Sequence, residues 1–260
     1  MAQQDRPADN VNLSILLICG FSFMVPIADA ATKIASETVN VPQITLMRFI
    51  TQSVILGAFF GVFARKSLIW PRPIAPLIWR GGFLAMATAF LYASLAVMPL
   101  IEATAILFVQ PLIITALSAA LLGETVGWRR ALAVLVGLTG AMIIIGPNLN
   151  ELGYGAILPL LSATCFAAVA LSTRRWANIA SLPMMLLVTA LSAMVFMAVL
   201  ITIAGLIGVG AVVLVMPDSR ALWLILFVGC LSTVTTMMIT QAFRIAPASV
   251  AAPFMYVEVV

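Results

Sequence analysis

The sequence predicts an all-α integral membrane protein. Of its 260 residues, 63% are hydrophobic and only 8% are charged, whereas a soluble domain of this size needs a charged surface around its apolar core. The apolar residues fall into successive runs of about 20 residues, the length that crosses the hydrocarbon core of a bilayer. These two observations place the chain in lipid and exclude a water-soluble globular domain.

The apolar runs predict eight helices and the start of a ninth. We expect helices over about 14–33, 43–63, 75–98, 101–122, 128–146, 153–173, 183–208 and 219–243, and a ninth apolar stretch over 248–260. Proline lies at several boundaries because it has no backbone N–H and disfavours helical geometry in the residue before it. The connections are short, so successive helices should be antiparallel neighbours.

The stretch from Tyr92 to Glu124 has two unusual features. The third and fourth helices meet at Met98-Pro99 with almost no loop, and Gln110-Pro111 lies near the middle of the fourth helix. There a polar side chain and a missing backbone donor occur together inside an apolar run. Pro99 and Pro111 are therefore candidate hinges.

The basic residues predict the orientation of the chain, because cytoplasmic loops are enriched in Lys and Arg. With the N-terminus inside, ten of the 13 basic residues fall on the inner side: Arg6, Arg65, Lys66, Arg72, Arg80, Arg129, Arg130, Arg174, Arg175 and Arg244. The other three, Lys33, Arg48 and Arg220, fall near the outer side. Residues 1–13 should form a cytoplasmic tail, and the first helix should be a retained span, since no small-residue cleavage site follows it.

An internal repeat relates the two parts of the chain. A shift of 148 residues aligns several pairs in order: Gly81-Gly82 with Gly229-Cys230, Pro99 with Pro247, Phe108 with Tyr256 and Gln110 with Glu258. A repeat of five helices, an odd number, inverts the second copy in the membrane, which is a recurrent transporter plan. We expect two inverted halves, residues 14–146 and 153–260, with a substrate site between them near the midplane and Pro247 as a hinge matching Pro99.

The chain resembles the EamA-type transporters of the drug/metabolite transporter superfamily. The resemblance is carried by IEATAILFVQPLIITALSAALLGE, by WRRALAVLVGLTGAMIIIGP that follows it, by QAFRIAPASVAAPFMYVEVV and by LMRF in the second helix. It implies ten helices in two inverted five-helix halves, a cavity that opens alternately to each side, and both termini in the bacterial cytoplasm. The ninth helix of the family would continue past Val260 and a tenth would follow, so we expect a sequence that is cut within helix 9.

Three polar residues are the principal candidates for a substrate site, because polar groups inside spans usually face a cavity. Asp29 either binds a cationic group or takes up a proton, or it pairs with Lys33 one helical turn away. Gln110 either donates to substrate beside carbonyls freed by Pro111 or links helices. Glu258 occupies the matching place in the second half, and a carboxylate there should face water or be protonated.

Three further residues are candidates with an ordinary alternative. Arg48 binds an anionic group or extends to the outer interface, and Tyr92 and Tyr256 line a cavity or pack against lipid. Gln241 and Arg244, at the inner end of the eighth helix, serve gating or anchoring.

The function we expect is secondary transport of a small metabolite or drug. The chain has no histidine, and its three cysteines lie in apolar runs, so neither a metal site nor a histidine-based enzyme is expected. No nucleotide-binding motif is present, so we expect no cofactor and no ATP dependence. The resemblance implies export of amino acids or related compounds most often, and import of compounds such as S-adenosylmethionine in some relatives; a non-transporting fragment is the other alternative. The expected partners are a small-molecule substrate and the bilayer, with no nucleic acid, in a monomer or homodimer.

Overall fold

The computed structural model describes residues 10–63, 71–95, 97–124, 126–145, 153–206 and 214–259, and within these ranges every regular element is helical. The α-helices are α1 (Val11–Ala35), α2 (Val41–Phe63), α3 (Ala75–Leu95), α4 (Leu100–Leu107), α5 (Gln110–Leu122), α6 (Trp128–Ile145), α7 (Ile157–Arg175), α8 (Leu182–Leu206), α9 (Ser219–Ile245) and α10 (Ala248–Ala251). Two 3-10 helices complete the list, η3 (Gly153–Ala156) and η4 (Ala252–Val259).

The helices are long enough to cross a bilayer. Seven stretches of the described residues qualify by length and composition: Val11–Ala35, Val41–Val62, Ala75–Leu95, Glu102–Leu122, Ile157–Arg175, Leu182–Leu206 and Ser219–Ile245. Large apolar side chains point outward from them, and Phe23 and Trp223 are each 73% exposed. In water such side chains would form an unfavourable surface, whereas in lipid they face a matching solvent. The predicted all-α membrane class is therefore confirmed.

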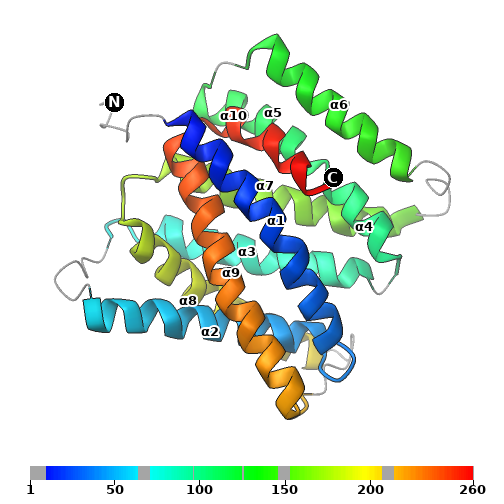
Figure 1. Ribbon diagram of the computed structural model, residues 1–260, viewed down its shortest axis with the longest axis vertical. Coiled ribbons are helices and arrows are strands. Elements are labelled where there is room, and N and C mark those ends of the chain that lie inside the picture. Colours follow the sequence, from blue (N-terminus) through cyan, green and yellow to red (C-terminus); the bar gives the residue numbers. More distant parts are fainter. Residues whose placement is uncertain are drawn as a thin grey trace.

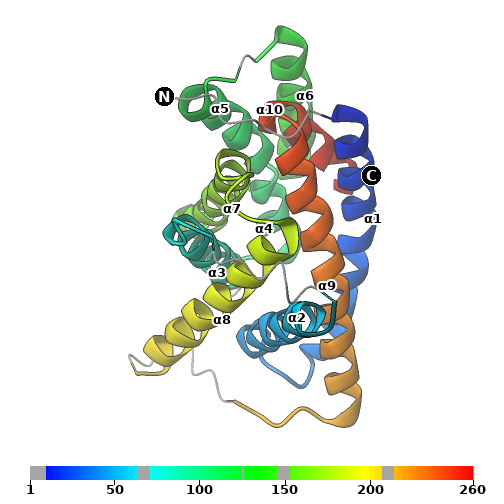
Figure 2. The same ribbon diagram turned by 90° about the vertical axis from the view of Figure 1, so that its left-hand side faces the viewer.

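The early helices pack on the late helices rather than on one another. α1 lies along α9, α2 packs on α8 and α9, and α3 packs on α7 and α8. Figure 1 shows α1 and α9 side by side along most of their lengths, and Figure 2 shows α2 crossing against α9. The segments near the break in the fourth span also follow this rule, because α5 packs on α7 and η4 packs on α1. The two parts of the chain thus form one interlocked bundle.

Two glycines allow a neighbouring helix to approach closely. A Cβ at Gly81 would lie 2.6 Å from the carbonyl oxygen of Thr189 in α8, and a Cβ at Gly229 would lie 2.6 Å from the side chain of Thr51 in α2. Real Cβ atoms do not approach this closely, so only glycine permits α3 to reach α8 and α9 to reach α2 at these points.

The predicted helix bounds are close to the observed ones, but the prediction of one continuous helix over 101–122 is wrong. The chain makes a turn at Phe108 and Val109, so α4 ends at Leu107 and α5 begins at Gln110. Pro111 causes the interruption because it has no N–H to donate to the carbonyl of Leu107, four residues earlier. The ninth stretch is also less regular than predicted, with α10 followed by a 3-10 helix.

Candidate functional site

Tyr256 of η4 contacts the turn between α4 and α5 and so links the second part of the chain to the first. The Tyr256 hydroxyl donates a hydrogen bond to the carbonyl oxygen of Phe108 (2.9 Å), and the centroids of the two rings are 6.3 Å apart. Phe108 and Tyr256 are one of the pairs that the internal repeat aligns. The segments that carry Gln110 and Glu258 are therefore neighbours, although the side chain of Glu258 lies outside the described residues.

Most of the other candidate residues of these two segments lie near the helix junctions. Gln110 is half-buried as the first residue of α5, and Pro111 beside it is buried. Tyr92 is half-buried on α3. Pro99 precedes α4 with φ −59° and ψ 148°, and Pro247 precedes α10 with φ −56° and ψ 136°. The two prolines aligned by the repeat thus start their helices in the same conformation, while their role as hinges stays a prediction.

Asp29 lies on α1, and Arg48 lies on α2. The Asp29 side chain is exposed and that of Arg48 is half-buried. The Arg48 guanidinium lies 5.0 Å from the centroid of the Phe49 ring, and its Nε has no hydrogen-bond partner among the described residues. Lys33, the alternative partner for Asp29, is exposed and makes no ion pair within 4.0 Å with Asp29 in the described structure.

A buried arginine joins four helices in a way that the sequence analysis missed. Arg80 of α3 is 2% exposed. Its Nε donates to Oγ1 of Thr173 (2.8 Å), and its two Nη atoms donate to Oγ1 of Thr189 (2.6 Å) and of Thr240 (2.8 Å). These threonines lie on α7, α8 and α9. The sequence analysis counted Arg80 only as a charge that sets orientation. An arginine inside an apolar helix, followed by Gly81-Gly82, was the available signal.

A second polar network ties the ends of α5, α7 and α9 to the start of α10. We call it the Glu124 network, made of Glu124, Arg174, Arg244, Ala248 and Ser249. The Glu124 carboxylate accepts the backbone N–H groups of Ala248 (3.1 Å) and Ser249 (3.0 Å) and lies 3.5 Å from Nε of Arg174. Both charged side chains are buried, at 7% and 3% exposure.

The arginines of the Glu124 network extend it to the α7–α8 connection. Nη1 of Arg174 donates to the carbonyl oxygen of Arg244 (3.1 Å), and the Arg244 guanidinium donates to the carbonyl oxygens of Ala177 and Ala180. Gating and anchoring were both open for Arg244 in the sequence analysis. Together with the contacts of Glu124 and Arg174, these bonds tie the ends of α5, α7 and α9 to one another at one end of the bundle.

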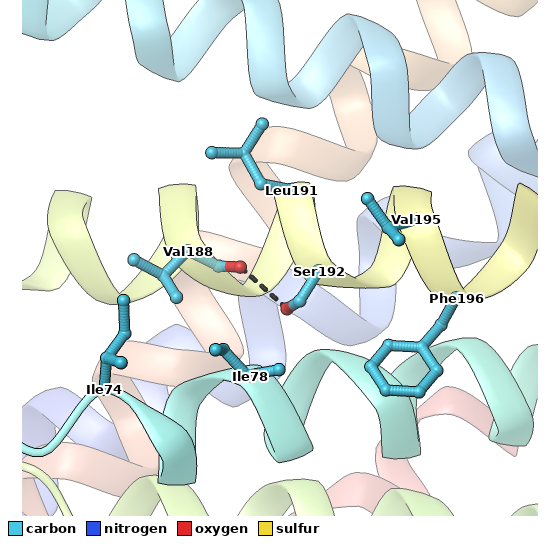
Figure 3. A pocket seen from close by; sticks show the side chains of 7 residues that line it. All are labelled: Ile74, Ile78, Val188, Leu191, Ser192, Val195 and Phe196. Atoms are coloured by element: carbon cyan, nitrogen blue, oxygen red, sulfur yellow. Dashed lines mark hydrogen bonds between the residues drawn. The ribbon is translucent and has the colours of Figure 1, made fainter.

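A groove in the described structure lies away from all these polar residues. It runs between α3 and α8, has a volume of about 310 Å³ and is lined by Ile74, Ile78, Val188, Leu191, Ser192, Val195 and Phe196 (Figure 3). Its one polar side chain, Ser192, donates to the carbonyl oxygen of Val188 in its own helix (2.7 Å). The groove offers no free polar group, and its apolar walls fit acyl chains better than a metabolite. Within the described residues no three His, Cys, Asp or Glu side chains gather as metal ligands.

The chain is similar to bacterial transporters over most of its length. It is 22% identical to the S-adenosylmethionine uptake transporter of Rickettsia prowazekii, over 90% of this chain and 76% of that protein. It is 34% identical to the riboflavin transporter of Rhizobium johnstonii, over 62% of this chain and 51% of that protein. A protein of known crystal structure has the same fold, with a TM-score of 0.75 and 16% identity over 96% of this chain and 86% of that one.

A family match covers the first half of the chain. Residues 12–146 match the EamA-like transporter family, which amounts to more than half of the 260 residues. The relatives named above belong to the same drug/metabolite transporter superfamily. This multi-pass membrane protein is a secondary transporter and not an enzyme, and it belongs to the EamA-like transporter family.

Proposed function

We propose that the protein moves a small metabolite across the bacterial inner membrane by alternating access between two inverted halves, residues 14–146 (helices 1–5) and 153–260 (helices 6–9). The observation that supports the proposal is a symmetric pattern in the packing of the helices. α1 packs on α9 while α7 packs on α3, and α2 packs on α9 while α8 packs on α3. A two-fold axis that relates α1 to α7, α2 to α8 and α3 to α9 accounts for both pairs at once.

The two close glycine contacts support the same symmetry. Gly81 of α3 lies against Ser192 of α8, and Gly229 of α9 lies against Thr51 of α2. The repeat aligns the glycines, and Thr51 and Ser192 are each nine residues after the proline at the start of their helix, Pro42 and Pro183. Equivalent contacts at equivalent positions favour a duplicated, inverted unit over a chance resemblance between apolar helices.

The substrate site of this proposal lies where the broken span meets η4, with Asp29 and Arg48 at its outer side. Gln110 and Tyr256 would supply neutral hydrogen bonds, and Tyr92 an aromatic wall. Glu258 is the member of the Gln110–Glu258 pair that can ionise, so it is the residue of this pair that would bind and release a proton during transport. Pro99, Pro111 and Pro247 would let the half-helices bend as the cavity changes sides.

The orientation in the proposal has the N-terminus in the cytoplasm, as the distribution of basic residues predicts. Three of those residues, Arg6, Arg65 and Lys66, lie outside the described residues. In this proposal the Glu124 network lies at the cytoplasmic end and holds the ends of the helices together there. The functional unit is a monomer or a homodimer.

The substrate class is an amino acid or a related compound. Export is the direction that the sequence resemblance implies, and import is a second candidate favoured by a specific observation. A relative that matches 90% of this chain is an uptake transporter for S-adenosylmethionine, and one that matches 62% of it is a riboflavin transporter.

The test is counterflow in proteoliposomes. The substrate panel is labelled S-adenosylmethionine, riboflavin and the twenty amino acids, with protein-free liposomes as the blank. We expect protein-dependent exchange of at least one solute. A correctly folded, reconstituted protein that exchanges none of them would overturn the proposed function.

The site is tested by two variants measured on the solute that exchanges. Gln110→Ala should lower the rate at every pH because a hydrogen bond to substrate is lost, by about tenfold or less. Glu258→Gln should remove the dependence of the rate on pH because the ionisable group is gone. If both variants keep the wild-type rate and pH profile, the site lies elsewhere in the protein.

A further inference from the structure

We propose that the groove between α3 and α8 binds one acyl chain of an anionic phospholipid, with the lipid phosphate at Arg72. This lipid site lies on the outer surface of the bundle and is separate from the substrate site of the proposed function. Three properties of the groove support it: its position on the lipid-facing surface, its length, and the charge at one of its ends.

The groove opens on the surface of two helices that are long and apolar enough to cross the bilayer. Of the residues that line it, Ile78 on α3 is 38% exposed and Val195 on α8 is 55% exposed. The space between them has a volume of about 310 Å³. Apolar walls lose dispersion contacts wherever no atoms lie against them, so the acyl chains of the surrounding lipid are drawn into such a space.

Aromatic rings bound the groove at one end. The ring of Phe196 lies over Gly82, 3.1 Å from the position that a Cβ of this residue would take. Its centroid is 6.5 Å from that of Trp79, which is 63% exposed. Figure 3 shows Phe196 at this end of the groove, and Ile74 and Val188 at the other. The groove therefore runs from the start of α3 to a pair of aromatic side chains.

The length of the groove matches the acyl chain of one leaflet. Val188 and Phe196 are eight residues apart on α8, which corresponds to about 12 Å along the helix. The hydrocarbon core is about 30 Å thick, so each leaflet contributes about 15 Å. A transmembrane helix of a second copy or of a partner protein would need a face about twice as long. The groove therefore fits a single acyl chain better than a helix.

The end of the groove at Ile74 is basic. Arg72 is exposed and precedes Ile74 by two residues. Arg175, exposed in the last turn of α7, precedes the start of α8 by seven residues. The two stretches of sequence that supply the walls, residues 38–101 and 152–217, contain no acidic residue. Basic residues near the membrane surface attract anionic lipids, so a lipid whose chain lies in the groove gains from a negative head group.

The first part of the test measures lipid preference without any solute. The full chain, with Trp79 as its only tryptophan and phenylalanine at the other four positions, is reconstituted in phosphatidylcholine vesicles. Phosphatidylglycerol with brominated acyl chains is then added in increasing proportion, and quenching of Trp79 fluorescence gives its affinity relative to phosphatidylcholine. We expect a preference of about fivefold for phosphatidylglycerol, the contribution of one basic residue near the surface. Equal affinity for the two lipids would overturn the proposal.

The second part assigns the head group to Arg72. Arg72→Gln should abolish the preference, because the phosphate loses its positive partner. Arg129→Gln is the matched control: Arg129 is also exposed, but it lies on α6, which packs on α4, α5 and η4. This variant should keep the preference. Equal losses in the two variants would reveal a general attraction of the basic surface for anionic lipid and would overturn the assignment.

The third part assigns the acyl chain to the groove. Val195→Phe places a larger side chain in the groove and should also abolish the preference, because the chain can no longer enter. Val199→Phe is the control, since Val199 lies one turn further along α8, is 49% exposed and does not line the groove. A preference that survives in Val195→Phe would place the lipid elsewhere on the protein.

Mass spectrometry of the intact wild-type protein decides the question if the variant with a single tryptophan does not fold. We expect one phosphatidylglycerol molecule to stay bound after release from detergent, and none in Arg72→Gln. Retention of no lipid would overturn the proposal. A protein dimer that Val195→Phe dissociates would also overturn it, because the groove would then be covered by a second copy of the chain.

Discussion

Arg80 holds a positive charge at a junction of four helices with three threonine hydroxyls as its partners. Arginine stays protonated in proteins, so the charge persists although no hydroxyl neutralises it. The hydroxyls of Thr173 and Thr189 also donate to the carbonyl oxygens of Val169 and Met185 in their own helices, both at 2.7 Å. Each hydroxyl is thereby oriented to accept from Arg80, and the guanidinium sets the spacing of α3, α7, α8 and α9.

A threonine variant tests this role at the residue scale. Thr189→Val should destabilise the protein by about 1–3 kcal/mol, because a buried N–H of Arg80 loses its acceptor. Thr202→Val is the matched control, since Thr202 lies on the same helix, is exposed, and makes the same kind of bond to the carbonyl of Ala198 (2.8 Å). The measurement is the unfolding midpoint in detergent. Equal midpoints for the two variants would contradict the role of the arginine.

At the element scale, the Glu124 network connects the first half of the chain to the second. Its carboxylate follows Gly123, which ends α5 in a left-handed conformation with φ 66°. From there it reaches the first N–H groups of α10 and the arginine in the last turn of α7. Alternating access requires these ends to separate, so the network has to break when the cavity opens on this side.

Weakening the network should open this end of the bundle. Glu124→Gln keeps the shape of the side chain but loses the charge that Arg174 pairs with, and a buried pair broken on one side is costly. We expect faster alkylation of a Ser118→Cys reporter, buried in the last part of α5, in a background whose three native cysteines are replaced by alanine. Glu37→Gln, an exposed acid between α1 and α2, is the control. Unchanged alkylation in Glu124→Gln would show that the network does not close this end.

At the scale of the whole molecule, the interlocked packing means that both parts of the chain share one orientation in the membrane. Because α1, α2 and α3 each pack on helices of the second part, the two parts cannot be inserted independently. One orientation therefore applies to all the connections.

Cysteine labelling decides that orientation. Glu37→Cys, in the α1–α2 turn, should react with a membrane-impermeant maleimide from outside intact spheroplasts, and Asn178→Cys, after α7, should react only once the membrane is permeabilised. Both positions are exposed. Labelling in the reverse order would place the N-terminus outside and the Glu124 network on the outer side.

The sequence alone determined the membrane class, the approximate position of each span and the junction at Met98-Pro99. These properties depend on local composition: an apolar run of span length must be helical in lipid, and proline acts on its own segment of backbone. The aligned pair of Phe108 and Tyr256 was also visible in the sequence, and it proved to be a direct contact.

Only the tertiary structure decided what the buried charges do. In the sequence, Arg80, Glu124 and Arg174 look like ordinary charges at helix ends. Their partners cannot be recognised there, because they lie between 50 and 160 residues away along the chain. Which hydroxyl or amide meets a guanidinium or a carboxylate depends on how helices pack. Packing in lipid is set by close contacts such as Gly81 on α8 and Gly229 on α2, rather than by hydrophobicity that all the spans share.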